Sequence, residues 1–411
     1  MKAIFLSLIL ILSFVVKAQD TTKVLFIGNS FTSANNLHLL FQQLANGDGK
    51  VVIVASHAPG GVSVGDISQG TSAHSNNPAV YSLIKSQDWD YLVLQDNQGR
   101  FCLSYGQFPQ SSLVIEGHLM IRDSLLYYHP CAKMIWFAGF ATKDGYPPYG
   151  NSAEALIDSL YHNYQYLNDT AKQIIAPIGP AFKRIIFNHP TIDLWSSDKV
   201  HPSLSGSYLT ANVVFSTIFK TNPSTSTYNP GLSSSVDSIL KNVAYQTTID
   251  SIATTGMQDI TPEITQNGNL LTVSGYSNCQ WFLNEMPLSS TNCSLDILQS
   301  GKYYCFATDS NGCSWRSLTE VIDYISDIWE NAGEGESELF LFPNPASDEL
   351  TIRVKPKSEI CIYNSLGQLV KSFRTEQPTE KVDLTGLADG FYLLHLTNDY
   401  KNRTERFIVK K

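Results

Sequence analysis

The sequence predicts an α/β domain with a parallel sheet covered by helices on both faces, followed by two small β-sandwich domains. In the first half of the chain, short continuous apolar runs alternate with helix-compatible segments. This pattern is typical of parallel strands that are buried on both faces. Beyond Met257 the apolar runs alternate, are broken by Gly, Asn and Ser, and show no helical period, which indicates antiparallel strands. The length of 411 residues allows two or three domains.

The α/β domain is expected over residues 22–257. Its strands are predicted at five apolar runs: Lys23–Ile27, Val51–Ala55, Tyr91–Leu94, Met134–Ala138 and Gln173–Ala176. Helices are predicted at six further segments: Leu37–Ala45, Pro78–Lys85, Ser111–Tyr127, Ala153–Leu167, Gly206–Phe215 and Ser234–Tyr245. The last of these helices is expected to close the domain.

Two β domains are expected after it. Residues 260–325 contain short strand-like runs, of which Gly301–Phe306 is the longest, and should form a small antiparallel sandwich. The polar segment 326–338 is rich in Gly and Glu and is predicted to be a linker. Residues 339–411 are again strand-like throughout and should form a third domain.

Composition narrows the class of protein. Hydrophobic residues make up 43% of the chain and charged residues 16%, which is typical of a globular protein with a sizeable core. The net charge of −9 argues against nucleic acid or an anionic membrane surface as the main partner, because both require a clustered positive field.

The first 18 residues are predicted to be a signal peptide. Lys2 supplies a positive charge, the segment Ile4–Val16 is almost continuously apolar, and Ala18 offers a small residue at the cleavage position. The mature protein should therefore be exported; a single N-terminal membrane anchor is the alternative. Seven cysteines suit an oxidising compartment. Four of them are expected to pair among themselves, with three possible connectivities: Cys279, Cys293, Cys305 and Cys313.

Ser30 is the first candidate for catalysis. It follows the first predicted strand in the segment Ile27–Thr32, at the edge where open α/β sheets bind ligands. Gly28 permits a sharp turn, and the N-terminus of the following helix offers N–H donors to a developing oxyanion. The alternative is that Ser30 only caps this helix.

Asp198 and His201 form the second candidate group. An Asp three residues before a His can accept a hydrogen bond from one imidazole nitrogen and leave the other as a base. Pro202 keeps the pair in a loop before the next helix. A chance pairing of surface residues is the alternative.

Two loops could supply oxyanion donors. The second strand runs into a loop with Gly60 and Gly61, whose backbone N–H groups can approach a ligand closely. The third strand runs into Gln95-Asp96-Asn97-Gln98, which places the Asn97 amide at the strand end. Each segment could equally be a tight turn or an Asx-type loop.

In this order, the four segments resemble the blocks of the SGNH (GDSL-like) hydrolase superfamily over nearly all of residues 22–256. The resemblance implies a flavodoxin-like three-layer α/β/α domain in which Ser30 attacks an ester carbonyl. His201 would take the serine proton, and Asp198 would orient the imidazole. The Ser30 N–H, Gly61 and Asn97 would hold the oxyanion, with Gly60 or Gly65 as alternatives to Gly61.

The sequence departs from the family pattern at two places. Asn29 stands where the nucleophile block usually has Asp, as it does in a branch of secreted bacterial members with a Gly-Asn-Ser motif. The third block reads QDNQ instead of GxND, although Asn97 remains in register.

The two tail domains carry resemblances of their own. Residues 260–322, with Trp281 and with Tyr303 two residues before Cys305, resemble an Ig/PKD-like module, which implies a spacer or a weak glycan binder. The last domain resembles the type IX secretion C-terminal sorting domain in three segments: Leu341–Asp348, Ile362–Val370 and Leu387–Leu394. That resemblance implies a seven-stranded β-sandwich that is read by an outer-membrane translocon and usually removed.

The sequence therefore predicts a secreted or surface-displayed serine esterase that works through an acyl-enzyme, without a metal or other cofactor. The expected partners are an acylated substrate and the type IX secretion machinery, and no nucleic acid. A small acyl group such as acetyl on a polysaccharide is the favoured substrate. The alternatives are a lipase or thioesterase-like member, or a non-catalytic glycan-binding protein on the same scaffold.

Overall fold

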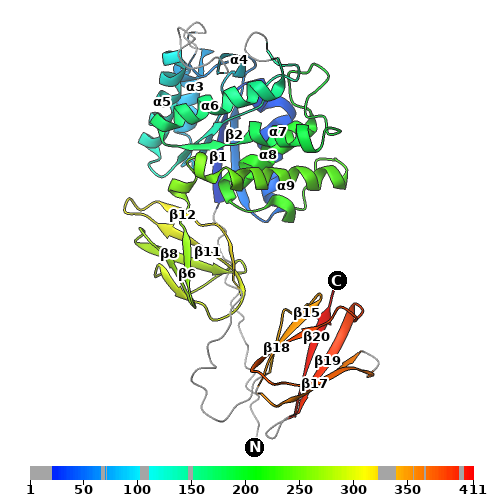
Figure 1. Ribbon diagram of the computed structural model, residues 1–411. Helices are drawn as coiled ribbons and strands as arrows, with labels where there is room; N and C mark the ends of the chain where they lie inside the picture. The colour runs from blue at the N-terminus through cyan, green and yellow to red at the C-terminus, as the bar shows by residue number, and fades with distance from the viewer. Residues whose placement is uncertain are drawn as a thin grey trace, which may run out of the picture. The chain divides into compact units, whose positions relative to one another are not determined.

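The computed structural model describes residues 21–65, 70, 72–101, 111–146, 151–322, 339–354, 356–364, 367–397 and 402–411. The chain divides into two compact units, Met1–Tyr324 and Ile325–Lys411 (Figure 1). The predicted signal peptide, Cys102 and the predicted linker 326–338 lie outside the described residues.

The first unit begins with a parallel five-stranded sheet, as predicted. Its strand order is β2-β1-β3-β4-β5, which is the flavodoxin-like order. The strands occur at the five predicted apolar runs: β1 (Thr21–Ile27), β2 (Val51–His57), β3 (Tyr91–Leu94), β4 (Lys133–Phe137) and β5 (Ile174–Ala176). Parallel pairing of β1 with both β2 and β3 brings the carboxyl ends of these three strands to one edge of the sheet.

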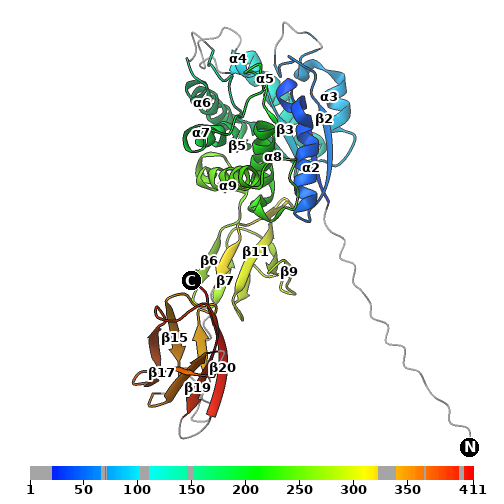
Figure 2. The ribbon, with the colours of Figure 1, turned by 90° about the vertical axis from the view of Figure 1, so that its right-hand side faces the viewer.

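Helices cover both faces of this sheet, because successive β1 residues point to opposite sides. Val24 and Phe26 pack against one group of helices: α2 (Leu37–Gly47), α7 (Ile178–Asn188), α8 (Leu204–Phe219) and α9 (Ser234–Asp250). Leu25 and Ile27 pack against the other: α3 (Pro78–Ile84), α5 (Ser111–Tyr128) and α6 (Ala153–Ala171). Helices α2 and α8 lie side by side (Figure 2). The predicted three-layer α/β/α arrangement is confirmed.

Helix α7 is missing from the sequence prediction. Pro177 precedes it and Pro180 lies in its first turn, where a missing N–H costs nothing because the first four donors of a helix have no intrahelical acceptor. Two prolines so close together are more typical of a loop, so the sequence gives little sign of this helix.

Two antiparallel sheets follow the last helix, which confirms the predicted β-sandwich. One contains β6 (Ile264–Asn267), β7 (Leu270–Val273) and β10 (Ser294–Asp296). The other contains β8 (Asn278–Leu283), β9 (Met286–Pro287), β11 (Gly301–Thr308), β12 (Ser314–Arg316) and β13 (Glu320–Ile322). Trp281 is fully buried between them, and the Tyr303 hydroxyl donates to the Gln299 carbonyl at 2.7 Å.

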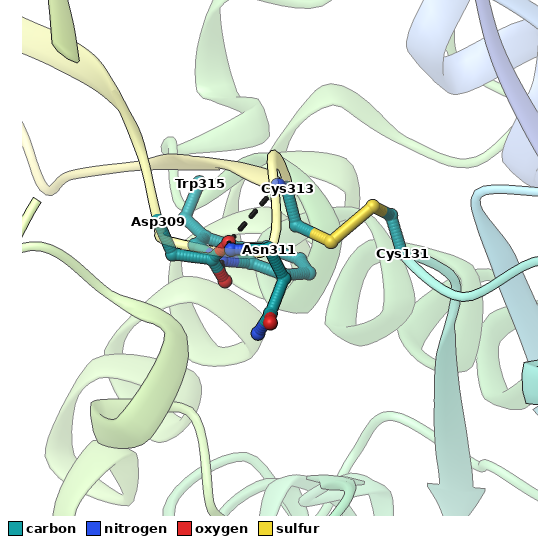
Figure 3. Close-up of a disulfide and its surroundings, with 5 residues drawn as sticks. All are labelled: Cys131, Asp309, Asn311, Cys313 and Trp315. Carbon is teal, nitrogen blue, oxygen red and sulfur yellow. Dashed lines mark hydrogen bonds between the residues drawn. A yellow bond between two sulfur atoms is a disulfide. The ribbon is translucent and has the colours of Figure 1, made fainter. Parts of the chain in front are cut away.

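The prediction that four cysteines pair among themselves is wrong for two of them. Cys279 and Cys293 are joined, but Cys313 pairs with Cys131 of the α/β domain, 182 residues earlier in the chain (Figure 3). Cys305 is a free thiol buried in the sandwich core. The pairing depends on which cysteines the fold brings within bonding distance, and the spacing along the chain does not contain that information.

The turn that carries Cys313 is held by one carboxylate (Figure 3). Asp309 accepts hydrogen bonds from the Cys313 N–H at 3.0 Å and from the Trp315 indole N–H at 3.1 Å. The Lys133 ammonium lies 4.6 Å from the centre of the Trp315 ring. Since Cys131 and Lys133 lie at the start of β4, the sandwich docks against the end of the α/β domain where the strands begin (Figures 1 and 2).

The second unit is a sandwich of two antiparallel sheets. In the described residues, one sheet contains β14 (Phe340–Phe342), β15 (Glu349–Arg353) and β18 (Thr379–Asp383). The other contains β16 (Glu359–Asn364), β17 (Leu369–Arg374), β19 (Gly390–Thr397) and β20 (Asn402–Val409). Alternating side chains such as Leu350, Ile352 and Leu394 fill the space between the sheets. Across the described part of the chain, no helix is long and apolar enough to span a membrane.

We predict that the double substitution of Cys131 and Cys313 by serine destabilises the first unit by about 2–5 kcal/mol, because the bridge closes a very long loop in the unfolded chain. Thermal denaturation of the full chain under non-reducing conditions measures the effect. Cys361, a free thiol in the second unit, gives the matched control Cys361→Ser, which should leave the transition of the first unit in place. An unchanged transition in the double variant would contradict a stabilising role for this bridge.

Candidate active site

Ser30 is the first residue of the helical turn α1 (Ser30–Ser33), directly after β1. The residue that caps this turn is Asn29, whose side-chain oxygen accepts a hydrogen bond from the Phe31 N–H at 3.1 Å. Capping of this turn is therefore the role of Asn29, and it does not explain Ser30. Ser30 is only partly buried and lies at the carboxyl edge of the sheet, opposite the end that carries the sandwich.

Asp198 and His201 are in direct contact. The distance between His201 Nδ1 and Asp198 Oδ2 is 2.6 Å, so Nδ1–H donates to the carboxylate and Nε2 keeps its lone pair. Asp198 Oδ1 also accepts from the Ser196 hydroxyl at 2.7 Å and from the backbone N–H groups of Val200 and His201, both at 2.9 Å. These hydrogen bonds, that of His201 first, hold the pKa of Asp198 well below its usual range.

The loop that carries this pair is held in a closed hairpin. Trp195 and Pro202 form an isolated antiparallel bridge, and the Ser196 N–H donates to the His201 carbonyl at 2.8 Å. The Trp195 indole N–H donates to the Ala141 carbonyl at 2.9 Å. Ser203 then caps helix α8. These contacts fix the imidazole before any substrate is present.

The hairpin lies beside the turn that carries Ser30. The rings of Phe31 and His201 have their centres 5.6 Å apart, and the Asn35 side-chain amide donates to the Pro202 carbonyl at 3.1 Å. Residues that are about 170 positions apart in the sequence are therefore neighbours at this edge of the sheet, as the prediction requires.

Gln95, which sequence reasoning did not select, connects β3 to the Ser30 turn. Its side chain is completely buried, and Oε1 accepts from the Asn29 N–H at 2.8 Å and from the Thr32 hydroxyl at 2.9 Å. A Cβ atom at Gly28 would lie 2.6 Å from the same oxygen, so only glycine fits there. The two departures from the family pattern, Asn29 and the QDNQ segment, are thus in contact with each other.

Asp96, also missed, joins the two predicted oxyanion loops. It is 1% exposed, and its Oδ1 accepts from the Val64 N–H at 2.7 Å and from the Asn97 N–H at 2.6 Å. Asn29 holds the same glycine loop from the other side, because its side-chain amide donates to the Val62 carbonyl at 3.1 Å. One buried network therefore connects the turn of Ser30, the glycine loop and the loop of Asn97.

One buried histidine supports this network, and a second lies beside it. His74 is fully buried, and burial lowers its pKa to about 4. The neutral ring therefore donates from Nε2 to the Gly28 carbonyl at 2.9 Å. His118 donates from Nδ1 to the Val114 carbonyl at 2.7 Å, and its Nε2 faces Asp96 Oδ2 at 3.8 Å. Burial also lowers the pKa of His118. Isolated histidines give no sequence signal for such a supporting role.

The three candidate glycines differ in their surroundings. Gly60 and Gly61 are both exposed, with nothing within 4 Å of a built Cβ atom, and of the two Gly61 alone has a left-handed φ, of +72°. Gly65 is buried, and a Cβ atom at Gly117 of helix α5 would lie 2.6 Å from its Cα. Close helix packing therefore explains Gly65, whereas Gly61 remains the preferred oxyanion candidate together with the half-buried Asn97. No group of three or more His, Cys, Asp or Glu side chains that could hold a metal ion occurs among the described residues.

Comparison with known proteins assigns the last domain. The family model described as a secretion system C-terminal sorting domain matches residues 340–410. The second unit carries this sorting domain. It implies secretion to the cell surface or the extracellular space. The predicted sorting domain is thereby confirmed.

Two curated proteins are similar to parts of this chain. Beta-agarase A of Zobellia galactanivorans is 42% identical over 65 residues, which are 15% of this chain and 12% of that protein. Karilysin of Tannerella forsythia is 26% identical over 113 residues, which are 24% of this chain and 23% of that protein. The chain thus covers less than a quarter of the length of either relative.

Several solved structures are similar to the chain at low sequence identity. A DUF4886 family protein from Bacteroides uniformis has a TM-score of 0.48 and 16% identity, over 58% of this chain and 99% of that one. An acetyl xylan esterase has a TM-score of 0.36 and 16% identity, over 47% and 98%. An aryl esterase of M. smegmatis has a TM-score of 0.34 and 12% identity, over 47% and 96%.

We predict that Asn29→Asp destabilises the first unit by about 1–3 kcal/mol, because a carboxylate cannot donate to the Val62 carbonyl and would be buried beside it. The exposed Asn242 offers a matched control, since Asn242→Asp adds the same charge at the surface. Chemical denaturation of both variants measures the difference. Equal stability of the two variants would show that the hydrogen bond to the glycine loop contributes nothing.

Proposed function

We propose that this protein is a secreted serine esterase that hydrolyses carboxylic esters through an acyl-enzyme. The observation that carries the proposal is the 2.6 Å contact between Asp198 and His201 on a hairpin that lies against the Ser30 turn. A carboxylate in contact with an imidazole, beside a turn that carries a serine hydroxyl, supports this proposal because nucleophilic acyl transfer requires these three groups.

In the proposed reaction, His201 Nε2 takes the proton of the Ser30 hydroxyl while Ser30 Oγ attacks the ester carbonyl. The ionised Asp198 stabilises the imidazolium that results and holds it in the reactive tautomer. Collapse of the tetrahedral intermediate expels the alcohol, which receives the proton from His201. Water, deprotonated by His201, then attacks the acyl-enzyme and releases the carboxylic acid, so that Ser30 is regenerated.

The oxyanion that forms in both steps needs donors that are already in place. We assign the Ser30 N–H at the start of α1, a backbone N–H at Gly61 and the Asn97 amide to this role. Gln95 and Asp96 would act as positioning residues, because they hold the backbone of the Ser30 turn and of both donor loops through buried hydrogen bonds. The helix dipole at the start of this short turn adds a favourable potential.

A small acyl group, such as acetyl on a polysaccharide, is the substrate that we favour. Support comes from the sorting domain, since an exported enzyme meets large extracellular polymers. A lipase or thioesterase-like activity uses the same residues and differs in acyl length. A glycan-binding protein without turnover is the alternative outside enzymes.

We predict that Ser30→Ala lowers kcat/KM for p-nitrophenyl acetate by about 10³-fold or more, because no other group forms the acyl-enzyme. Ser33 lies on the same helical turn and is exposed, so Ser33→Ala is the matched control and should retain activity. Both variants should unfold at the wild-type temperature. A Ser30→Ala protein with wild-type turnover would refute the nucleophile assignment, and polysaccharide binding without turnover in the wild type would favour the binding protein.

We predict that Asp198→Asn lowers kcat by about 10³–10⁴-fold while KM changes little, because the amide favours the wrong imidazole tautomer but leaves the substrate site intact. Steady-state kinetics separate the two parameters. Asp193, an exposed acid of the same segment that pairs with Lys143 at 2.8 Å, provides the control Asp193→Asn. A similar loss of activity in both variants would show that the effect arises from the loop fold and not from the dyad.

A further inference from the structure

A cavity lies between the α/β domain and the β-sandwich, at the end of the parallel sheet opposite Ser30. Its volume is about 180 Å³, and residues of both domains line it. A single water occupies roughly 10–15 Å³ on the same measure, so the cavity has room for a small organic molecule. Sites of this kind occur preferentially at domain interfaces.

Two cations line this cavity side by side. Lys220 follows helix α8 and is 4% exposed, and Arg316 ends β12. Burial first, and the neighbouring Arg316 charge second, lower the pKa of Lys220 to about 7. Burial also lowers the pKa of Arg316. Like charges that are withdrawn from water cost several kcal/mol unless an anion compensates them.

The described hydrogen bonds of these cations go mainly to neutral acceptors. The Lys220 ammonium donates to the backbone carbonyls of Ile260 at 3.0 Å and Arg316 at 2.8 Å. An ammonium has three donors, so one remains after these two bonds. The Arg316 guanidinium donates to the Ser317 carbonyl and the Thr319 hydroxyl. Among the described residues, no carboxylate lies within 4.0 Å of either cation.

The other charged groups near the cavity do not balance this charge. Lys50 also lines it and has its own acid, Asp48, at 3.9 Å. Glu285 is an exposed residue that accepts a hydrogen bond from the Tyr304 hydroxyl at 2.9 Å and attracts Arg316 from there. One exposed carboxylate thus faces the buried Lys220 and the half-buried Arg316, which leaves a net positive charge around the cavity.

Aromatic side chains form much of the remaining wall, namely Tyr91, Tyr304, Phe306 and Trp315. The Arg316 guanidinium lies 4.0 Å from the centre of the Tyr304 ring, which holds its plane in place. Apolar walls with a few convergent cations are the surroundings that bind a molecule with an apolar body and one anionic group.

We propose that this cavity binds a small organic carboxylate, whose anionic group pairs with Lys220 and Arg316 and whose body packs against the aromatic wall. The site is separate from the proposed catalytic residues and does not depend on the proposed function. The ligand would add a second contact between domains that the Cys131–Cys313 bridge already joins, because each domain supplies one of the cations.

The test uses the full chain and two probes of equal size, benzoate and its neutral counterpart benzamide. Isothermal titration should show saturable benzoate binding at up to about 20 mM, and benzamide should bind about tenfold more weakly or not at all. Ser30→Ala should bind benzoate as the wild type does. No saturable binding, or equal binding of the two probes, would overturn the proposal.

Substitutions of residues that line the cavity test whether benzoate binds there. Lys220→Met should weaken benzoate binding about tenfold or more, because it removes one of the two cations. Lys302→Met, which removes an exposed lysine of β11, is the control and should bind normally. Ser314→Glu would place a carboxylate from the chain itself at the edge of the cavity, and should abolish benzoate binding without lowering thermal stability. If Lys220→Met fails to fold, wild-type binding by Ser314→Glu overturns the proposal.

Discussion

The buried carboxylate of Asp96 is the interaction on which the candidate site depends. A polar group that is 1% exposed is tolerated only when hydrogen bonds replace its hydration. Asp96 obtains them from the backbone N–H groups of two loops, at Val64 and Asn97. The need to satisfy one carboxylate therefore fixes the distance between loops that follow different strands. Loops that carry catalytic groups usually move, and here their anchor lies in the core.

Asn29 connects this anchor to the turn that carries Ser30. An amide can accept from the Phe31 N–H and donate to the Val62 carbonyl at the same time, which a carboxylate cannot do. The Gly28-Asn29-Ser30 segment thus suits the neighbouring Gln95, whose Oε1 accepts from the Asn29 backbone. In this chain the two departures from the SGNH pattern, Asn29 and the QDNQ segment, are joined by a hydrogen bond. The residue at one position therefore has to suit the residue at the other.

The sequence predicted what depends on local pattern and missed what depends on packing. Continuous apolar runs located all five parallel strands, because burial on both faces leaves a strong signal. The Asp198–His201 pair was predictable because three residues of separation suffice for contact. Gln95 and His74 gave no such signal, since their partners lie 66 and 46 residues away. The Cys131–Cys313 bridge was missed for the same reason, since it depends on how one domain docks on another.

The two ends of the parallel sheet differ in what they carry: one end carries the candidate catalytic loops, and the other carries the β-sandwich. Strands that begin at one edge and end at the other leave the carboxyl edge open for loops with reactive groups. The opposite edge is covered by the sandwich through the bridge at Cys131 and through Lys220, which donates to a carbonyl of β12. The Cys131–Cys313 bond and the buried Lys220 hold the β-sandwich of the first unit at this edge, away from the candidate catalytic loops. The sandwich therefore covers the end of the sheet where the strands begin. Because Ser30 lies at the opposite end, a substrate can reach it without any separation of the α/β domain from the sandwich.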